Sequence, residues 1–174
     1  MGGVEVSTLS TAVGFTRGSS EEIKVVVICT RAGPLQSALS LAGIPVIISP
    51  RPCSYSVTAR IAGRSVTNPI AVLWAAGSIL VAVVRLVRAL PKDCSVIVTK
   101  GLLAHLYGGM SARLIGRRCV WHVQEVANSD AMWGLGGKGF NLAAARPADR
   151  IFVPAPSVSP HFPTAQPPLK RRLY

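Results

Sequence analysis

The chain has 174 residues, of which 49% are hydrophobic, a length and composition that fit one domain with a substantial core. Its 19 Lys and Arg against 7 Asp and Glu give a net charge of +12, which favours anionic partners such as nucleotides, phosphorylated sugars and acidic lipids. Nucleic acid is not expected as a partner, because no basic stripe is interleaved with aromatic residues.

The mean hydropathy of +0.42 raises the question of a membrane segment. The longest apolar stretch, residues 70–84, is 15 residues long and is followed by Arg85 and Arg88. A spanning helix needs about 20 apolar residues, so this stretch predicts a largely buried helix. A short or interfacial membrane segment is the alternative. The N-terminus shows no signal-peptide pattern.

The four cysteines show no zinc-like spacing, and they are expected to be reduced residues of a cytoplasmic protein. No metal ion is predicted.

Strand-like and helix-like runs alternate along the chain. Short β-branched runs predict strands, and apolar runs bounded by Gly or Pro predict helices. The predicted strands are residues 24–30, 44–49, 94–99, 118–123 and 150–154, and the predicted helices are residues 33–43, 69–90, 101–116 and 136–148. Residues 51–68 are expected to form a turn-rich loop. Asn68 followed by Pro69 marks the start of the next helix.

This alternation with short links is typical of an α/β fold, a Rossmann-like parallel sheet with helices on both faces. In such sheets ligands bind at the carboxyl ends of the strands. His122 lies near the end of a predicted strand, so the following loop is expected at the functional edge. Residues 154–174 contain six prolines and predict an irregular basic tail after a domain of residues 1–153.

Four segments carry a resemblance to a known family. In chain order they are MGGVEVSTLSTAVGF, GPLQSALSLAGIPVIISP, SVIVTKGLLAHLYGGMSARLIGRRCVWHVQE and ADRIFVPAPSVSPHF. Their order and spacing resemble the N-terminal domain of the family-4 glycosyltransferases, which have the two-domain GT-B fold. The resemblance implies transfer of a sugar from a nucleotide-sugar donor to an acceptor hydroxyl, with retention at the anomeric carbon and no further cofactor.

The chain also departs from this family. The family's first strand would precede Gly2, and its donor-binding domain with two glutamates is not among these residues. We therefore expect a domain truncated at both ends, with the donor-binding domain as its missing partner and no activity by itself.

The resemblance places His122 at the interdomain cleft, and it is the predicted catalytic residue. An imidazole there can hydrogen-bond a sugar hydroxyl and stabilise charge developing at the anomeric carbon. The alternative is a strand-end histidine bonded to a backbone carbonyl. Gly2 and Gly3 resemble the loop near the donor's phosphates, where a bare backbone approaches a ligand. Lys100, at a predicted strand end, is the other candidate for phosphate.

The acceptor is predicted to contact residues of the loop after His122. Gln124 and Glu125 could orient an acceptor hydroxyl, although a solvated acid is an equal reading of Glu125. Trp133 is the predicted sugar-stacking aromatic. Trp121 and His105 are expected to be structural.

The leading hypothesis is an acceptor-side glycosyltransferase domain of polysaccharide or glycolipid biosynthesis. Its acceptor would be a lipid-linked sugar, a growing polysaccharide or a small polyol, and the basic surface and apolar helix suit peripheral contact with the inner face of a membrane. Two alternatives remain open. One is a non-catalytic Rossmann-like module that binds a nucleotide or a separate partner. The other is a small basic membrane protein anchored by residues 70–90.

Overall fold

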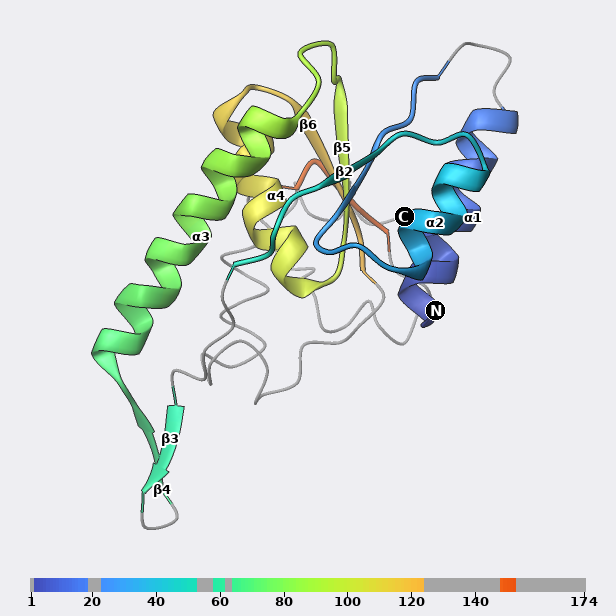
Figure 1. The fold of residues 1–174 in the computed structure, drawn as a ribbon. Helices are drawn as coiled ribbons and strands as arrows, with labels where there is room; N and C mark the ends of the chain where they lie inside the picture. The colour runs from blue at the N-terminus through green and yellow to red at the C-terminus, as the bar shows by residue number, and fades with distance from the viewer. Residues whose placement is uncertain (1, 19–22, 53–57, 62–63, 124–147, 153–174) are drawn as a thin grey trace. The chain divides into compact units, whose positions relative to one another are not determined.

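The computed structural model describes residues 2–18, 23–52, 58–61, 64–123 and 148–152 (Figure 1). These residues form two compact units, divided between Arg51 and Pro52. Both units combine helices with short strands, and the parallel pairings within them confirm the predicted α/β class. The predicted helix 136–148, apart from Ala148, and the predicted tail lie outside the described residues.

The first unit is a strand-helix-strand unit preceded by a helix. Its elements are α1 (Gly3–Gly18), β1 (Val27–Cys29), α2 (Pro34–Leu41) and β2 (Val46–Ile48). The two strands are parallel, with Val27 opposite Val46. Gly43 ends the turn after α2 at a φ of 74°, a left-handed conformation that favours glycine. A small core of Ala12, Cys29, Leu39 and Ile44 holds this unit together.

The second unit begins with a hairpin where a loop was predicted. β3 (Thr58–Ile61) and β4 (Arg64–Thr67) are antiparallel, with Thr58 opposite Thr67. The prediction of a turn-rich loop over residues 51–68 was therefore wrong for this part. The Thr, Ile and Val residues of the two segments favour strands, and pairing the segments satisfies their backbone hydrogen-bonding groups.

The long helix α3 (Pro69–Ala89) confirms the helix predicted over residues 69–90. The prediction that this helix is largely buried was wrong: only 28% of its apolar stretch is buried, because one side packs inside the unit and the other carries exposed apolar side chains. The Asn68 side-chain oxygen accepts hydrogen bonds from the N–H groups of Ile70 at 3.0 Å and Ala71 at 3.4 Å. Pro69 occupies the first turn, where its missing N–H costs nothing. One side of α3 packs against α4 (Leu102–Leu114).

The strands β5 (Val96–Lys100), β6 (Arg118–His122) and β7 (Arg150–Phe152) form a parallel sheet in the order β5-β6-β7. Asp149 fixes the start of the β6-β7 pairing, because its carboxylate accepts from the Cys119 N–H and its own N–H donates to the Cys119 carbonyl, both at 2.7 Å. The core beneath the sheet consists of Ile97, Ala112, Cys119, Trp121, Val123, Ala148 and Ile151.

Candidate functional site

Two predicted site residues meet at the carboxyl edge of this sheet. Lys100 is the last residue of β5 and His122 the last of β6, and they are register partners. Residues in register on neighbouring strands project to the same face, with the strands about 4.8 Å apart. Both side chains are half-buried. On the other side His122 pairs with Phe152 of β7. The predicted catalytic histidine and the predicted phosphate-binding lysine are therefore neighbours.

The chain turns from β5 into α4 directly after Lys100. Gly101 makes this turn at a φ of 92° and a ψ of 146°, a backbone conformation that side-chain-bearing residues rarely adopt. No side chain caps α4 and no acidic residue lies in its first turn. The first N–H groups of an uncapped helix carry partial positive charge. The start of α4 thus adds to the positive charge of Lys100 at this edge.

The surroundings of His122 favour its neutral form. Burial lowers the pKa of the imidazole below its ordinary 6.5, and the charge of Lys100 lowers the pKa further. Burial also lowers the pKa of Lys100. At neutral pH His122 therefore presents an unprotonated ring nitrogen that can accept a hydrogen bond.

Next to these two residues, Thr99, His105 and Trp121 form a buried cluster, here called the buried layer. His105 of α4 is 1% exposed, and its Nδ1 lies 2.7 Å from the Thr99 hydroxyl. Its ring stacks on Trp121 with the centroids 4.7 Å apart and an interplanar angle of 18°. Burial, followed by the charge of His122, lowers the pKa of His105 to about 3. His105 and Trp121 belong to the core, as expected from their positions in the sequence.

Gly108 of α4 allows this layer to form. A Cβ on Gly108 would lie 2.5 Å from Cγ2 of Thr99, closer than two carbon atoms can approach. The helix can therefore lie against β5 at this point only because residue 108 has no side chain. This contact positions His105 against Thr99, the residue directly before Lys100.

The other predicted donor-site residues lie in the first unit. Gly2 precedes α1 and Gly3 is its first residue, both exposed. The Gly2 N–H donates to the Glu5 carboxylate at 2.9 Å. No contact in this unit tests their predicted role near the donor's phosphates, which stays a prediction.

The predicted acceptor contacts Gln124, Glu125 and Trp133 lie outside the described residues, so they too stay predictions. Cys29 and Cys119 are buried, and burial raises the pKa of both thiols, that of Cys119 to about 11. Neither is a reactive thiolate at neutral pH.

No protein-family model and no curated protein matches the chain. Solved structures share its fold. HepE from Anabaena in complex with UDP gives a TM-score of 0.64 at 15% identity, over 92% of this chain and 36% of that chain. HepE in complex with UDP-glucose gives 0.61 at 14% identity, over 93% and 36%. MurG from Acinetobacter baumannii gives 0.56 at 20% identity, over 87% and 38%.

These neighbours are GT-B glycosyltransferases, and the chain spans little more than a third of their length. At such identities the likeness shows the fold alone. The chain therefore has the α/β fold of one part of a GT-B glycosyltransferase.

Proposed function

We propose that the chain is the acceptor-side part of a glycosyltransferase of the family-4 type. It would transfer a sugar from a nucleotide-sugar donor to an acceptor hydroxyl, with retention at the anomeric carbon. The observation that carries the proposal is the register pairing of Lys100 with His122 at the carboxyl edge of a parallel sheet. This is the edge at which ligands bind in open α/β sheets. HepE, which shares the fold, was solved with UDP and with UDP-glucose, and this supports a UDP-sugar as donor.

His122 would act as a neutral hydrogen-bonding group. Its lowered pKa leaves a ring nitrogen free to accept a hydrogen bond from a sugar hydroxyl at neutral pH. Such a bond can hold the hydroxyl in line with the anomeric carbon and stabilise charge that develops there. The stacked and hydrogen-bonded His105 beneath the edge helps to keep β5 and β6 in place for this contact.

Lys100 and the first turn of α4 would stabilise negative charge on the phosphate of the donor. When the glycosidic bond to the nucleotide breaks, charge accumulates on the departing phosphate, and a nearby ammonium and helix N-terminus stabilise it. Gly2 and Gly3 would supply a second phosphate contact at the start of α1. Gln124, Glu125 and Trp133 would contact the acceptor. The nucleotide sugar is the donor substrate, and no separate cofactor is required.

The rest of the enzyme is part of the proposal. The donor-binding domain would be supplied by a partner or by further chain, and the acceptor would be a lipid-linked sugar, a polysaccharide or a polyol. The net charge of +12 suits work on the cytoplasmic side, in peripheral contact with the inner face of a membrane.

The test is a transfer assay with the chain together with its donor-binding domain, as one longer protein or as a co-expressed partner, because the chain by itself is not expected to be active. Labelled UDP-sugars are supplied with saccharide and lipid-linked acceptors, and product is separated from donor. His122→Ala is expected to lower kcat by about 100-fold, within the range of a lost acid-base or hydrogen-bonding group. Lys92→Met removes a charge before β5, away from this edge, and should leave kcat unchanged. Nucleotide binding without transfer, equally strong in His122→Ala, would instead identify a non-catalytic binding module.

A further inference from the structure

The helix α3 is apolar on two opposite sides. Its inner side packs within the second unit through the buried residues Ala75, Ile79, Ala82, Val83 and Leu86. Its other side carries six large apolar side chains that are 44 to 75% exposed: Ile70, Leu73, Trp74, Leu80, Val81 and Val84. These six, here called the outer stripe, recur at helical spacings of three, four and seven residues. They therefore form one continuous band along the helix.

An exposed band of this kind marks an interaction surface. Single exposed apolar residues are ordinary, but six on one side of a helix are not. The helix is long and apolar enough to cross a membrane by length and composition. However, its inner side is committed to the fold: it packs against α4, where the Ser111 hydroxyl lies 3.4 Å from the Val83 carbonyl. If α3 spanned a bilayer, it would be separated from α4. The outer stripe is therefore expected to contact the surface of a partner and not to cross a membrane.

The charge beside the outer stripe distinguishes between a second copy of the chain and an anionic membrane as its partner. Arg85 and Arg88 lie four residues after Val81 and Val84, so they continue the same side of the helix, and both are exposed. A second copy of this chain would bring another net charge of +12 and the same two arginines, which repel. Anionic lipid headgroups attract them. Trp74 adds a side chain that is enriched where membranes meet water.

We propose that α3 lies in the plane of a membrane that contains anionic lipid. The outer stripe enters the boundary between headgroups and acyl chains, and Arg85 and Arg88 contact the headgroups. This surface lies outside the proposed catalytic edge and gives the broader expectation of membrane contact a defined location. Its test contains no sugar donor, so failure here would remove the proposed membrane contact but leave the transfer assay and the proposed sugar transfer unaffected.

The test is sedimentation of the 174-residue chain with vesicles of phosphatidylcholine alone or with added phosphatidylglycerol. Binding to the anionic vesicles, released by a carbonate wash, is the expected result. The double variant Leu73→Glu/Leu80→Glu is expected to lower the partition coefficient at least about ten-fold, since each substitution puts a charge into the apolar boundary. Leu114→Glu is the matched control: Leu114 is a leucine of α4, 68% exposed and outside the stripe, and its variant should bind as the parent does.

A second measurement locates the helix at the lipid. Lipids brominated near the headgroup should quench tryptophan fluorescence of the bound chain, and most of this quenching should disappear in Trp74→Phe. Circular dichroism of each variant confirms that the helices are retained.

Four results would overturn the proposal. They are absence of binding to anionic vesicles, equal binding by the parent and the double variant, resistance to the carbonate wash, and a dimer that the double variant dissociates. The third would mean a spanning helix, and the fourth a second copy on the stripe.

Discussion

At the scale of single residues, the protonation of His122 depends on Lys100. The two share a register position, and the lysine charge is the second cause, after burial, of the lowered imidazole pKa. Lys100→Met keeps the length of the side chain and removes the charge. We expect the pKa of His122 to rise in this variant while staying below its ordinary value, because burial remains. Proton NMR of the imidazole during a pH titration measures the shift.

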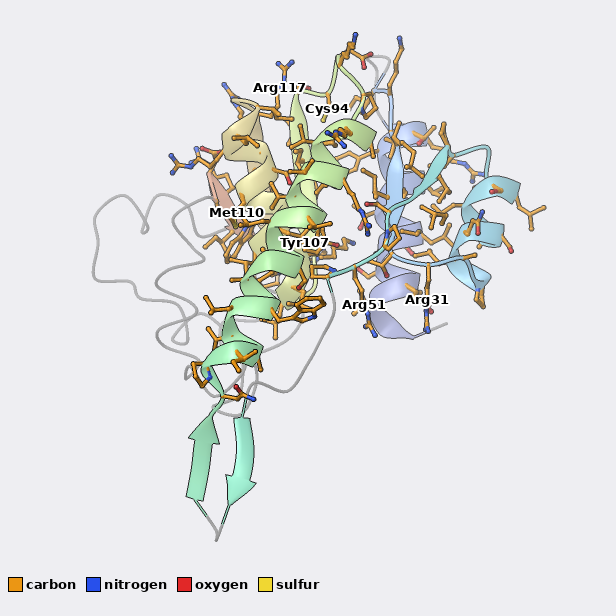
Figure 2. The ribbon with its side chains drawn as sticks, turned by 60° about the vertical axis from the view of Figure 1, so that its left-hand side comes forward. Arg31, Arg51, Cys94, Tyr107, Met110 and Arg117 are labelled. Carbon is orange, nitrogen blue, oxygen red and sulfur yellow. The ribbon has the colours of Figure 1, made fainter. Side chains whose placement is uncertain are left out.

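Lys92→Met is the matched control for this titration. Lys92 precedes β5, and its carbonyl accepts a hydrogen bond from Arg117 at 3.0 Å. Cys94 and Arg117 lie close together near the starts of β5 and β6, at the end of the sheet opposite to Lys100 and His122 (Figure 2). The substitution changes the net charge of the chain equally but should leave the His122 pKa unchanged. Equal shifts in both variants would show that overall charge, rather than the Lys100 contact, sets the protonation of His122.

Because the pKa of His105 is lowered in the folded chain, we expect the chain to lose stability in acid. Its pKa is about 3 in the folded chain and about 6.5 when unfolded. Above pH 6.5 His105 is neutral in both the folded and the unfolded chain, so it adds no pH dependence to the free energy of unfolding. Between pH 6.5 and 3 the unfolded state binds the proton first, so the free energy of unfolding falls as the pH falls. At about 1.4 kcal/mol per pKa unit, the full loss is on the order of a few kcal/mol.

The variant His105→Phe isolates this contribution. A phenyl ring can stack on Trp121 but cannot bind a proton. Denaturant unfolding at several pH values between 7.5 and 4 should show a flatter pH dependence in the variant than in the parent. At neutral pH the variant should lose some stability, because the Thr99 hydroxyl loses its 2.7 Å hydrogen bond to His105 and keeps only the longer one to the Val120 carbonyl at 3.4 Å. Parallel pH profiles would mean that the pKa of His105 is the same in the folded and the unfolded chain.

At the scale of helices and strands, the contact between α4 and β5 rests on Gly108. In Gly108→Ala the new methyl group would overlap Cγ2 of Thr99. We expect a loss of about 1 to 2 kcal/mol in the free energy of unfolding, since overpacking outweighs the better helix propensity of alanine. Gly77→Ala in α3 is the matched control, because nothing lies within 4 Å of a Cβ there. It should gain about 0.5 to 1 kcal/mol.

The overlap itself can be removed in a double variant. Thr99→Ser deletes Cγ2 but keeps the hydroxyl that contacts His105. Combined with Gly108→Ala, it should recover much of the lost stability, and a double-mutant cycle measured by denaturant unfolding gives the coupling. If the stability losses of the two single variants simply add in the double variant, the loss in Gly108→Ala does not come from overlap with Cγ2 of Thr99.

Local signals explain which elements could be predicted. The start of α3 was predicted correctly because Asn68 and Pro69 act within their own turn, as the Asn68 hydrogen bonds show. The hairpin of β3 and β4 was missed because its turn residues were interpreted as loop. Two four-residue runs separated by Ala62 and Gly63 would have been the signal for it.

The site was predictable only in part. Lys100 and His122 follow from the rule that parallel strands end at a common edge, which needs no knowledge of contacts. The layer of Thr99, His105 and Trp121 comes from three elements, and no spacing in the sequence shows that these side chains touch. The requirement for glycine at position 108 has the same origin, because the atom it avoids belongs to another element.

At the scale of the whole molecule, the proposed sugar transfer would require more than the edge of the sheet that carries Lys100 and His122. The chain spans 36 to 38% of the length of the GT-B structures it resembles. The resemblance implies that transfer takes place between two domains, with the nucleotide held mainly by the other one. The edge with Lys100 and His122 would then supply only part of the contacts that stabilise the transition state, and catalysis depends on contacts made there together.

We therefore predict that these 174 residues by themselves do not transfer sugar. Incubated with UDP-glucose and saccharide or lipid-linked acceptors, the purified chain should release UDP no faster than buffer, because positioning of donor against acceptor is absent. Heat-treated protein sets the background, and circular dichroism shows that the tested sample is folded. UDP release above this background that disappears in His122→Ala would contradict the prediction. It would mean that the edge of one three-stranded sheet binds both substrates and that the second domain serves only to increase the rate.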